Sequence, residues 1–291
     1  MTTSNSTLLM SRVTFGRALR RLRSGVNHFT LVDVAAALDC DTSLISRIET
    51  GKRVCSQQHF TKLMDLYEVP ASQRDELVEL YAASRDRRQP WWSPYGDVIS
   101  AQYERFIGFE AVASTVHEYQ VGILPGLLQT EAYAQAVTSV GFTSLGPDQI
   151  EALVEVRGLR QRHRLLETDA PMQCNYVVTQ AALEFRVGGE RTHREQLEHL
   201  LEISKHGSVD LRVIPYDKGE EAAQIGAFMI LEFSDEDVPD VAFGESVAGS
   251  LTIDGPRDLR RLHRLFRSLA EAAYSPEESR DIIARTLNKE D

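Results

Sequence analysis

The chain has 291 residues, 42% of them hydrophobic, and a formal net charge of −11, which predicts a two-domain protein of ordinary globular composition. The charge is uneven along the chain. Residues 1–90 carry 13 Lys and Arg and 10 Asp and Glu, whereas residues 91–291 carry 19 Lys and Arg and 33 Asp and Glu. Contact with nucleic acid is therefore expected in the first part only. No apolar run is long enough to span a membrane, and the amino-terminal residues do not have the pattern of a signal peptide. The three cysteines, Cys40, Cys55 and Cys174, have the spacing of neither a disulfide framework nor a zinc site. Together these features predict a cytoplasmic protein.

The first two helices are predicted from apolar spacing and from a capping residue. Val13–Ser24 carries Leu19 and Leu22 on one face. A second helix follows Thr30, whose hydroxyl can accept a free backbone N–H. Its apolar residues recur at positions i, i+3, i+4 and i+7: Leu31, Val34, Ala35 and Leu38.

A tight turn and a third helix come next. Asp39 tolerates left-handed backbone and Asp41 is a suitable helix cap, so a new helix is expected from Thr42 to about Thr50, ended by Gly51. The residues expected to face the core are Leu44, Ile45 and Ile48. The polar residues on the opposite face, where a DNA major groove would lie, are Thr42, Ser43, Ser46 and Arg47. Two short helices joined in this way have the layout of a DNA-binding helix-turn-helix.

Two further helices, Ser56–Tyr67 and Ser72–Arg88, complete an all-α five-helix helix-turn-helix DNA-binding domain over residues 11–88. Residues 91–288 are predicted to form an α+β regulatory domain, which opens on Trp91 and Trp92. The preferred interpretation of the two tryptophans is that they pack the linker onto this domain, and the alternative is an aromatic wall of a pocket.

Helices and mostly antiparallel strands are expected in the second domain. The predicted helices are Ala101–Tyr119, Gln129–Val140, Asp148–Glu167, Gln180–Val187, Arg191–Lys205, Asp258–Ala273 and Glu277–Asn288. The predicted strands are Met172–Thr179, Val209–Ile214, Ile225–Phe233, Val238–Gly244 and Ser250–Ile253.

The segment from about Phe15 to Pro70 resembles the phage-repressor and Cro-like helix-turn-helix family, also called the xenobiotic-response-element family, through the run Ser46-Arg47-Ile48-Glu49-Thr50-Gly51-Lys52-Arg53. The resemblance implies base contacts by Thr42, Ser43 and Arg47 and phosphate contacts by Thr30, Thr50 and Lys52. From their positions on and directly after the third helix, Ser46 is a candidate contact to a base or a phosphate, and Arg53 is a candidate phosphate contact. The resemblance places Arg23 and Glu49 where the family has a buried ion pair. Two departures are Leu31, where the family most often has a phosphate-bracing glutamine, and the Ser24–Phe29 link, which is one residue longer.

The second domain is similar to an uncharacterised domain fused behind Cro-like modules in actinobacterial-type regulators. The run Leu124-Pro125-Gly126-Leu127-Leu128-Gln129-Thr130-Glu131-Ala132-Tyr133-Ala134 carries this resemblance. Such regulators are described as antitoxin-like and are commonly paired with a small protein encoded nearby. The resemblance therefore implies a small neighbouring-gene protein as a candidate partner.

No motif for catalysis, a cofactor or a metal is complete. His117-Glu118 begins a zinc-protease string that ends at Val121 instead of a second histidine. Three other histidines, His193, His199 and His206, lack the i, i+4 spacing of a metal pair on a helix and are predicted to be solvated. We therefore expect no enzymatic activity, no cofactor and no metal site.

Two arginine clusters are predicted to be exposed helix faces paired with nearby glutamates, with a dock for an acidic partner or a second DNA contact as the alternative. The first consists of Arg157, Arg160 and Arg164. The second consists of Arg257, Arg260, Arg261, Arg264 and Arg267.

Together these features predict a sequence-specific, nucleoid-associated transcriptional regulator, with repression expected. It would bind a palindromic double-stranded DNA operator as a homodimer and would not bind a membrane. Two alternatives stay open. The chain acts as an antitoxin-like interaction module that binds a small partner protein and regulates its own promoter, or it acts as a small-molecule-sensing regulator.

Overall fold

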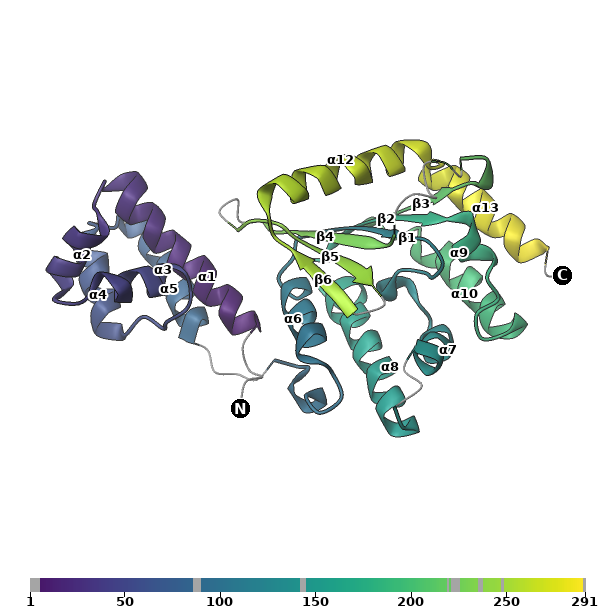
Figure 1. Cartoon of the computed structure of the whole chain (residues 1–291), viewed down its shortest axis with the longest axis horizontal. Helices are drawn as coiled ribbons and strands as arrows, with labels where there is room; N and C mark the ends of the chain where they lie inside the picture. The colour runs from purple at the N-terminus through teal and green to yellow at the C-terminus, as the bar shows by residue number, and fades with distance from the viewer. Residues whose placement is uncertain are drawn as a thin grey trace. The chain divides into compact units, whose positions relative to one another are not determined.

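The computed structural model describes residues 6–85, 90–141, 145–218, 220, 226–234, 238–246 and 249–289. The chain forms two compact units, one containing helices α1 to α5 and the other containing a six-stranded sheet. The predicted fold class, an all-α five-helix helix-turn-helix domain followed by an α+β domain, is confirmed (Figure 1).

Residues 6–85 of the first unit form five α-helices around one apolar core (Figure 1). The helices are α1 (Ser6–Arg20), which continues into the π-helical turn η1 (Arg21–Val26), α2 (Leu31–Leu38), α3 (Thr42–Glu49), α4 (Gln57–Leu66) and α5 (Ala71–Arg85). Its most buried side chains include Phe15, Leu19, Val34, Ile45, Ile48 and Leu63. Each helix thus contributes its apolar face to the interior, as the spacing predicts.

The first helix is longer than predicted. It begins at Ser6 rather than Val13, and it ends in a π-helical turn in which the amide of Asn27 donates to the carbonyl of Leu22 at 3.0 Å. The Asn27 side chain donates to the same carbonyl at 2.9 Å and to the Tyr67 carbonyl at 3.3 Å. Because a π-helical turn takes up one additional residue, it accommodates the longer link that the sequence predicts before α2.

Gly16 allows α1 to cross the end of α3 at close range. A Cβ atom at this position would lie 2.4 Å from the carbonyl oxygen of Ile48 and 2.6 Å from that of Glu49, both backbone atoms. We expect Gly16→Ala to lower the free energy of unfolding by about 1–3 kcal/mol, because the helices must move apart. Denaturant unfolding of the full chain followed by circular dichroism measures this loss.

Gly25→Ala is the matched control, because its Cβ would meet only the Arg21 Cγ at 3.9 Å. This variant should match or exceed the stability of the wild type. Equal stability of the Gly16→Ala and Gly25→Ala variants would show that the close approach of α1 and α3 does not require glycine.

The second unit contains a mixed sheet in the strand order β3-β2-β1-β4-β5-β6. Its strands are β1 (Thr115–Gln120), β2 (Gln173–Thr179), β3 (Val209–Ile214), β4 (Phe228–Glu232), β5 (Val241–Ser246) and β6 (Gly249–Ile253). The pairs β1–β2 and β2–β3 are parallel, whereas β1–β4, β4–β5 and β5–β6 are antiparallel. The prediction of mostly antiparallel strands is confirmed, because three of the five pairs of described strands are antiparallel. The parallel exceptions join β1, β2 and β3, where helical segments connect the strands.

Helices accompany this sheet on both sides, with α12 lying along one face (Figure 1). The remaining helical segments of the described chain after α5 are η2 (Ser93–Tyr95), α6 (Ala101–Glu110), η3 (Gly126–Leu128), α7 (Glu131–Gly141), α8 (Pro147–Gln161), η4 (Arg162–Leu166), α9 (Gln180–Glu184), α10 (Glu190–Ile203), η5 (Tyr216–Lys218), α12 (Pro256–Ala272) and α13 (Pro276–Asn288). Leu259, Phe266 and Leu269 of α12 pack onto the sheet residues Tyr119 and Ile230.

One strand was missed by the sequence prediction. The predicted helix Ala101–Tyr119 ends at Glu110, and the sequence then forms β1, the strand that joins the parallel and antiparallel halves of the sheet. Glu118 and Gln120 obscure the strand pattern because they are polar yet buried, and the Gln120 amide donates to the Glu118 carboxylate at 2.9 Å. Polar residues with this composition favour a helix or a loop in a sequence-based prediction.

The Leu124–Ala134 run is fixed by buried polar side chains. The Gln129 amide donates to the Leu124 carbonyl at 2.7 Å, and the Gln196 amide donates to the Leu128 carbonyl at 2.8 Å. The Gln161 amide donates to the Leu127 carbonyl at 2.8 Å. These contacts satisfy the backbone of a buried irregular segment, so a structural role explains the conspicuous sequence of this run.

The first arginine cluster is not an exposed face, because Arg160 is buried and Arg157 and Arg164 are half-buried. Arg160 is 5% exposed, Arg157 donates to the Gln129 Oε1 at 2.6 Å, and Arg164 donates to the Ala113 carbonyl. The prediction of a solvated basic face is therefore wrong for these residues. It is also wrong for His193, which is buried with its Nε2 2.7 Å from the Leu183 carbonyl oxygen.

Trp92 is 2% exposed and packs edge-to-face on Trp91, with ring centroids 5.3 Å apart. This arrangement agrees with a packing role for the pair. No helix in the described part of the chain combines the length and apolar character that crossing a membrane requires.

Candidate nucleic-acid interface

Helix α2 and the turn that joins it to α3 are set by one threonine and two aspartates. Thr30 caps α2, Asp39 ends it in left-handed backbone with φ 54°, and the Asp41 carboxylate caps α3 by accepting from the Ser43 amide at 2.6 Å. These are the residue types that such positions favour. These local contacts therefore set the angle between α2 and α3.

The outward face of α3 is polar and accessible. Thr42, Ser43 and Arg47 are exposed, while Ile45 and Ile48 are each 2% exposed and face the core. Within the residues that the structure describes, the side chains of Thr42, Ser43 and Arg47 make no internal hydrogen bond or ion pair. Donors and acceptors of this kind, presented along one helix face, are available to the edges of bases.

Ser46 lies at the margin of this face. It is half-buried, and its carbonyl oxygen accepts the Thr50 hydroxyl at 2.7 Å. Leu44 is also half-buried and packs against the core, as predicted. The exposed polar face of α3 therefore consists mainly of three residues, with Thr42 and Ser43 in its first turn and Arg47 in its last turn.

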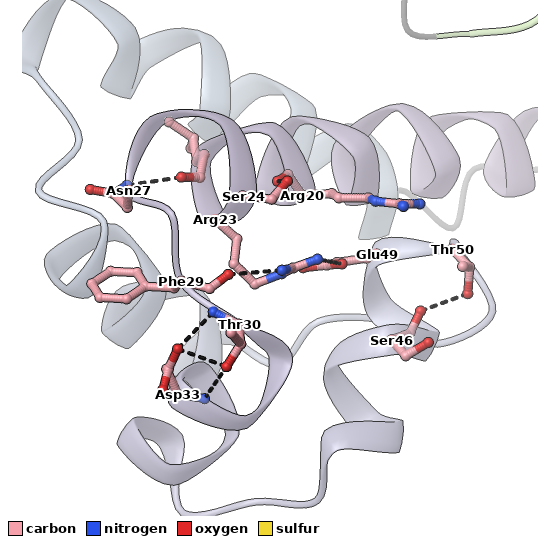
Figure 2. A network of polar contacts seen from close by, with 11 residues as sticks. Arg20, Arg23, Ser24, Asn27, Phe29, Thr30, Asp33, Ser46, Glu49 and Thr50 are labelled. Atoms are coloured by element: carbon pink, nitrogen blue, oxygen red, sulfur yellow. Dashed lines mark hydrogen bonds and ion pairs between the residues drawn. The ribbon is translucent and has the colours of Figure 1, made fainter.

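A bidentate ion pair anchors the far end of α3 (Figure 2). The Arg23 Nε donates to Glu49 Oε1 at 2.6 Å, and an Arg23 terminal nitrogen donates to Glu49 Oε2 at 2.9 Å. The other terminal nitrogen donates to the Phe29 carbonyl at 2.9 Å. The side chains are only 9% and 5% exposed, and the hydrogen bond to Glu49 raises the pKa of Arg23. The Arg23 guanidinium thus connects η1, the segment before α2 and the end of α3.

Thr30 and Thr50 both use their hydroxyl protons internally, as Figure 2 shows. Thr30 Oγ1 donates to Asp33 Oδ2 at 2.7 Å and accepts from the Asp33 amide at 3.2 Å. The Thr30 backbone amide donates to the same Asp33 oxygen at 2.7 Å, which completes a capping box. Since a DNA phosphate offers only acceptors, either threonine must give up its internal bond to donate to it. The role of Asp33 was not predicted, although the spacing Thr-x-x-Asp is typical of a capping box.

Lys52 and Arg53 follow α3 directly and are both exposed. Gly51 makes this exit possible: its φ is +71°, its amide donates to the Ile48 carbonyl at 3.0 Å, and a Cβ would lie 2.9 Å from the Val13 amide nitrogen. The chain therefore turns sharply and presents two cations beside the end of α3, where phosphates can be bound.

Asp41 places a negative charge at the amino end of the same helix. Its hydrogen bond to Ser43 keeps the pKa of the carboxyl below its usual value, so it is ionised at neutral pH. The Arg47 charge contributes to this lowering, which indicates that the two side chains share one electrostatic environment. The carboxylate stabilises the helix end and repels an approaching phosphate.

Two family models match the chain. Residues 103–285 match the model described as a domain of unknown function (DUF5753), and residues 14–77 match the model described as a helix-turn-helix domain. No curated protein and no solved structure matches the chain. The helix-turn-helix match covers the ion pair, the turn and α3, and it supports a DNA-binding regulator of transcription.

Proposed function

Since the chain belongs to the DUF5753 family and carries a helix-turn-helix domain ahead of that region, we propose that it is a sequence-specific repressor that binds a palindromic operator as a homodimer. In this proposal α3 enters the major groove. Thr42, Ser43 and Arg47 read base edges, with Ser46 at the margin, and Lys52 and Arg53 fix the register on phosphates. The proposal assigns no enzymatic step to the chain.

The observation that carries this proposal is the unpaired polar face of α3 on a rigid support. The Arg23–Glu49 pair and the Asp41 cap hold the two ends of the helix, while the face that contains Arg47 makes no internal bond among the described residues. A guanidinium so presented can span the O6 and N7 atoms of a guanine.

The homodimer follows from energetics. A single helix of eight residues reads only a few base pairs, and two-fold symmetric binding doubles the contacts on half-sites about 34 Å apart. Footprinting on the bound promoter, together with sedimentation at the same protein concentration, tests this part. A symmetric protected site and a dimer are expected, whereas one asymmetric half-site bound by a monomer would contradict it.

A second candidate function, binding of an acidic partner protein, is favoured by the outer face of α12. Five arginines on this helix are exposed, whereas Leu259, Phe266 and Leu269 face the sheet. The exposed set is Arg257, Arg260, Arg261, Arg264 and Arg267. An arginine-rich face of this kind attracts acidic protein surfaces and steers their association.

We expect the triple reversal Arg260→Glu, Arg261→Glu and Arg264→Glu to abolish co-purification with the small protein of the neighbouring gene and to leave operator affinity unchanged. Reversal of Arg191, Arg194 and Lys205, which makes the same change in net charge on another surface, is the control. Loss of operator affinity in the α12 variant alone would show a second DNA contact instead. If the α12 variant binds the operator and the partner protein as the wild type does, this face has no role in either interaction.

A further inference from the structure

A polar pocket of about 330 Å³ lies beneath α12 on the sheet of the second unit. It is lined by residues from four strands and from α12, among them His117 of β1, Asn175 of β2, Glu232 of β4 and His263 of α12. Neither tryptophan lines it, so this pocket differs from the aromatic one considered from the sequence. Two histidines and a carboxylate that converge on an open pocket form an unusual group for a regulatory domain.

The three side chains are close enough to share one ion. His117 Nε2 lies 3.1 Å from Glu232 Oε1, and His263 Nδ1 lies 3.6 Å from the same oxygen. All three ligand atoms lie within 4.8 Å of one another. Ligands bound at about 2.1 Å in tetrahedral geometry are about 3.4 Å apart, so small side-chain adjustments bring these atoms into range.

Each histidine is also oriented through its second nitrogen. His263 Nε2 lies 2.8 Å from Asp240 Oδ2, which leaves Nδ1 without a proton when Nε2 donates to that carboxylate. His117 Nδ1 lies 3.3 Å from the Asn175 amide nitrogen, and rotation of this amide presents its oxygen to Nδ1–H instead. A carboxylate or carbonyl oxygen behind a ligand histidine is the usual outer partner in protein metal sites.

The charges and the surroundings suit a divalent cation. Glu232 and Asp240 together carry two negative charges, and the nearby Arg212 is neutralised by Asp210 in a bidentate pair at 2.8 and 3.0 Å. The other cation in the pocket lining, Arg267, is an exposed residue. Side-chain exposures between 19% and 34% leave the ligands reachable from solvent through the pocket. Three protein ligands leave one position for water or a small ligand, as in open zinc sites.

We propose that His117, Glu232 and His263 bind a divalent transition metal of the Zn²⁺ type, with Asp240 and Asn175 orienting the two histidines. The ligands come from β1, β4 and α12, so the bound ion connects the arginine-bearing helix to the sheet. Nitrogen and oxygen ligands of this number favour Zn²⁺ and its neighbours over Ca²⁺ or Mg²⁺. The inference is independent of the function proposed for α3.

Titration of tag-free, chelator-treated full-length protein with Zn²⁺ in a calorimeter tests the proposal. We expect one ion per chain and a raised unfolding temperature of the loaded protein, because ligand binding to the folded state stabilises it. Asp240→Ala should weaken binding about 10- to 100-fold, as loss of an outer partner does. His263→Ala and His117→Gln should weaken it further. Co²⁺ should give a visible absorption band that Zn²⁺ displaces.

His206→Gln and Cys40→Ser are the controls, because each removes a metal-binding side chain outside the pocket, and both should bind as the wild type does. Far-UV circular dichroism of the metal-free variants checks that they are folded. If His117→Gln is unfolded, the Asp240→Ala titration and Co²⁺ spectrum give the answer. Absence of saturable binding by the wild type, or binding unchanged in folded His263→Ala and Asp240→Ala, would overturn the proposal and leave a metal-free hydrogen-bonded network.

Discussion

Arg47→Ala should weaken operator binding by about 5- to 150-fold for each half-site, which corresponds to about 1–3 kcal/mol for each bidentate base contact. The side chain is exposed on α3 and makes no internal hydrogen bond or ion pair within the described part of the chain, so its removal should not disturb the fold. Fluorescence anisotropy on the operator and on operators with single base-pair changes measures this loss. Discrimination at one base pair of each half-site should disappear in the variant.

Lys52→Ala is the informative comparison because it removes an exposed cation next to α3 rather than on its reading face. It should weaken binding to all sequences about equally and reduce the slope of log affinity against log salt concentration by about 1 for each monomer contact. If Arg47→Ala behaves in the same way, with no change in base preference, Arg47 contacts phosphate rather than a base.

Glu49→Ala should lower the free energy of unfolding by about 3–5 kcal/mol, more than Gly16→Ala does. The substitution leaves the Arg23 guanidinium buried without its carboxylate, and the hydrogen bond to the Phe29 carbonyl does not neutralise its charge. Urea unfolding gives the overall loss, and hydrogen–deuterium exchange of the α3 amides locates it. Exchange in the strands of the second unit should not change.

The double variant Arg23→Met and Glu49→Leu separates the cost of an unpaired charge from the value of the pair. Apolar side chains of similar volume should recover most of the stability that Glu49→Ala loses, since a buried pair gains little over good packing. Glu195→Ala removes one partner of an exposed pair and should leave the stability unchanged. Wild-type stability of Glu49→Ala would contradict the anchoring role of the ion pair.

Most of the first unit was predictable because its signals are local. The helix ends depend on contacts within a few residues, made by the caps Thr30 and Asp41, by the left-handed residue Asp39 and by Gly51. The apolar spacing defines the face of each helix that packs in the core. The position of helix one was less predictable, because a π-helical turn depends on Asn27 bonding to Tyr67, 40 residues away.

The second unit was predicted less well because several of its polar residues are withdrawn from solvent and bond to partners within the protein. Arg157 and Arg164 have the spacing of a solvated helix face, yet they donate to Gln129 and to the Ala113 carbonyl in the interior. Likewise β1 has the polar composition of a loop or helix, because Glu118 pairs with Gln120 inside the protein. Burial of polar groups with internal partners leaves no periodic signal in the sequence.

The proposed metal ligands were missed for a related reason. His117, Glu232 and His263 are separated by 115 and 31 positions, so no short motif joins them. The local zinc-protease string that begins at His117 is incomplete, so the sequence predicts no metal site. Antiparallel pairing of β1 with β4 and the packing of α12 on the sheet bring the three side chains together.

Genomic footprinting of the wild type beside Arg47→Ala tests most directly whether α3 reads DNA. The predicted result is a set of discrete protected sites in the wild type, each with two half-sites about 34 Å apart, and loss of these sites in the variant. Equal occupancy of the same sites by both proteins, or no discrete site for the wild type, would contradict it.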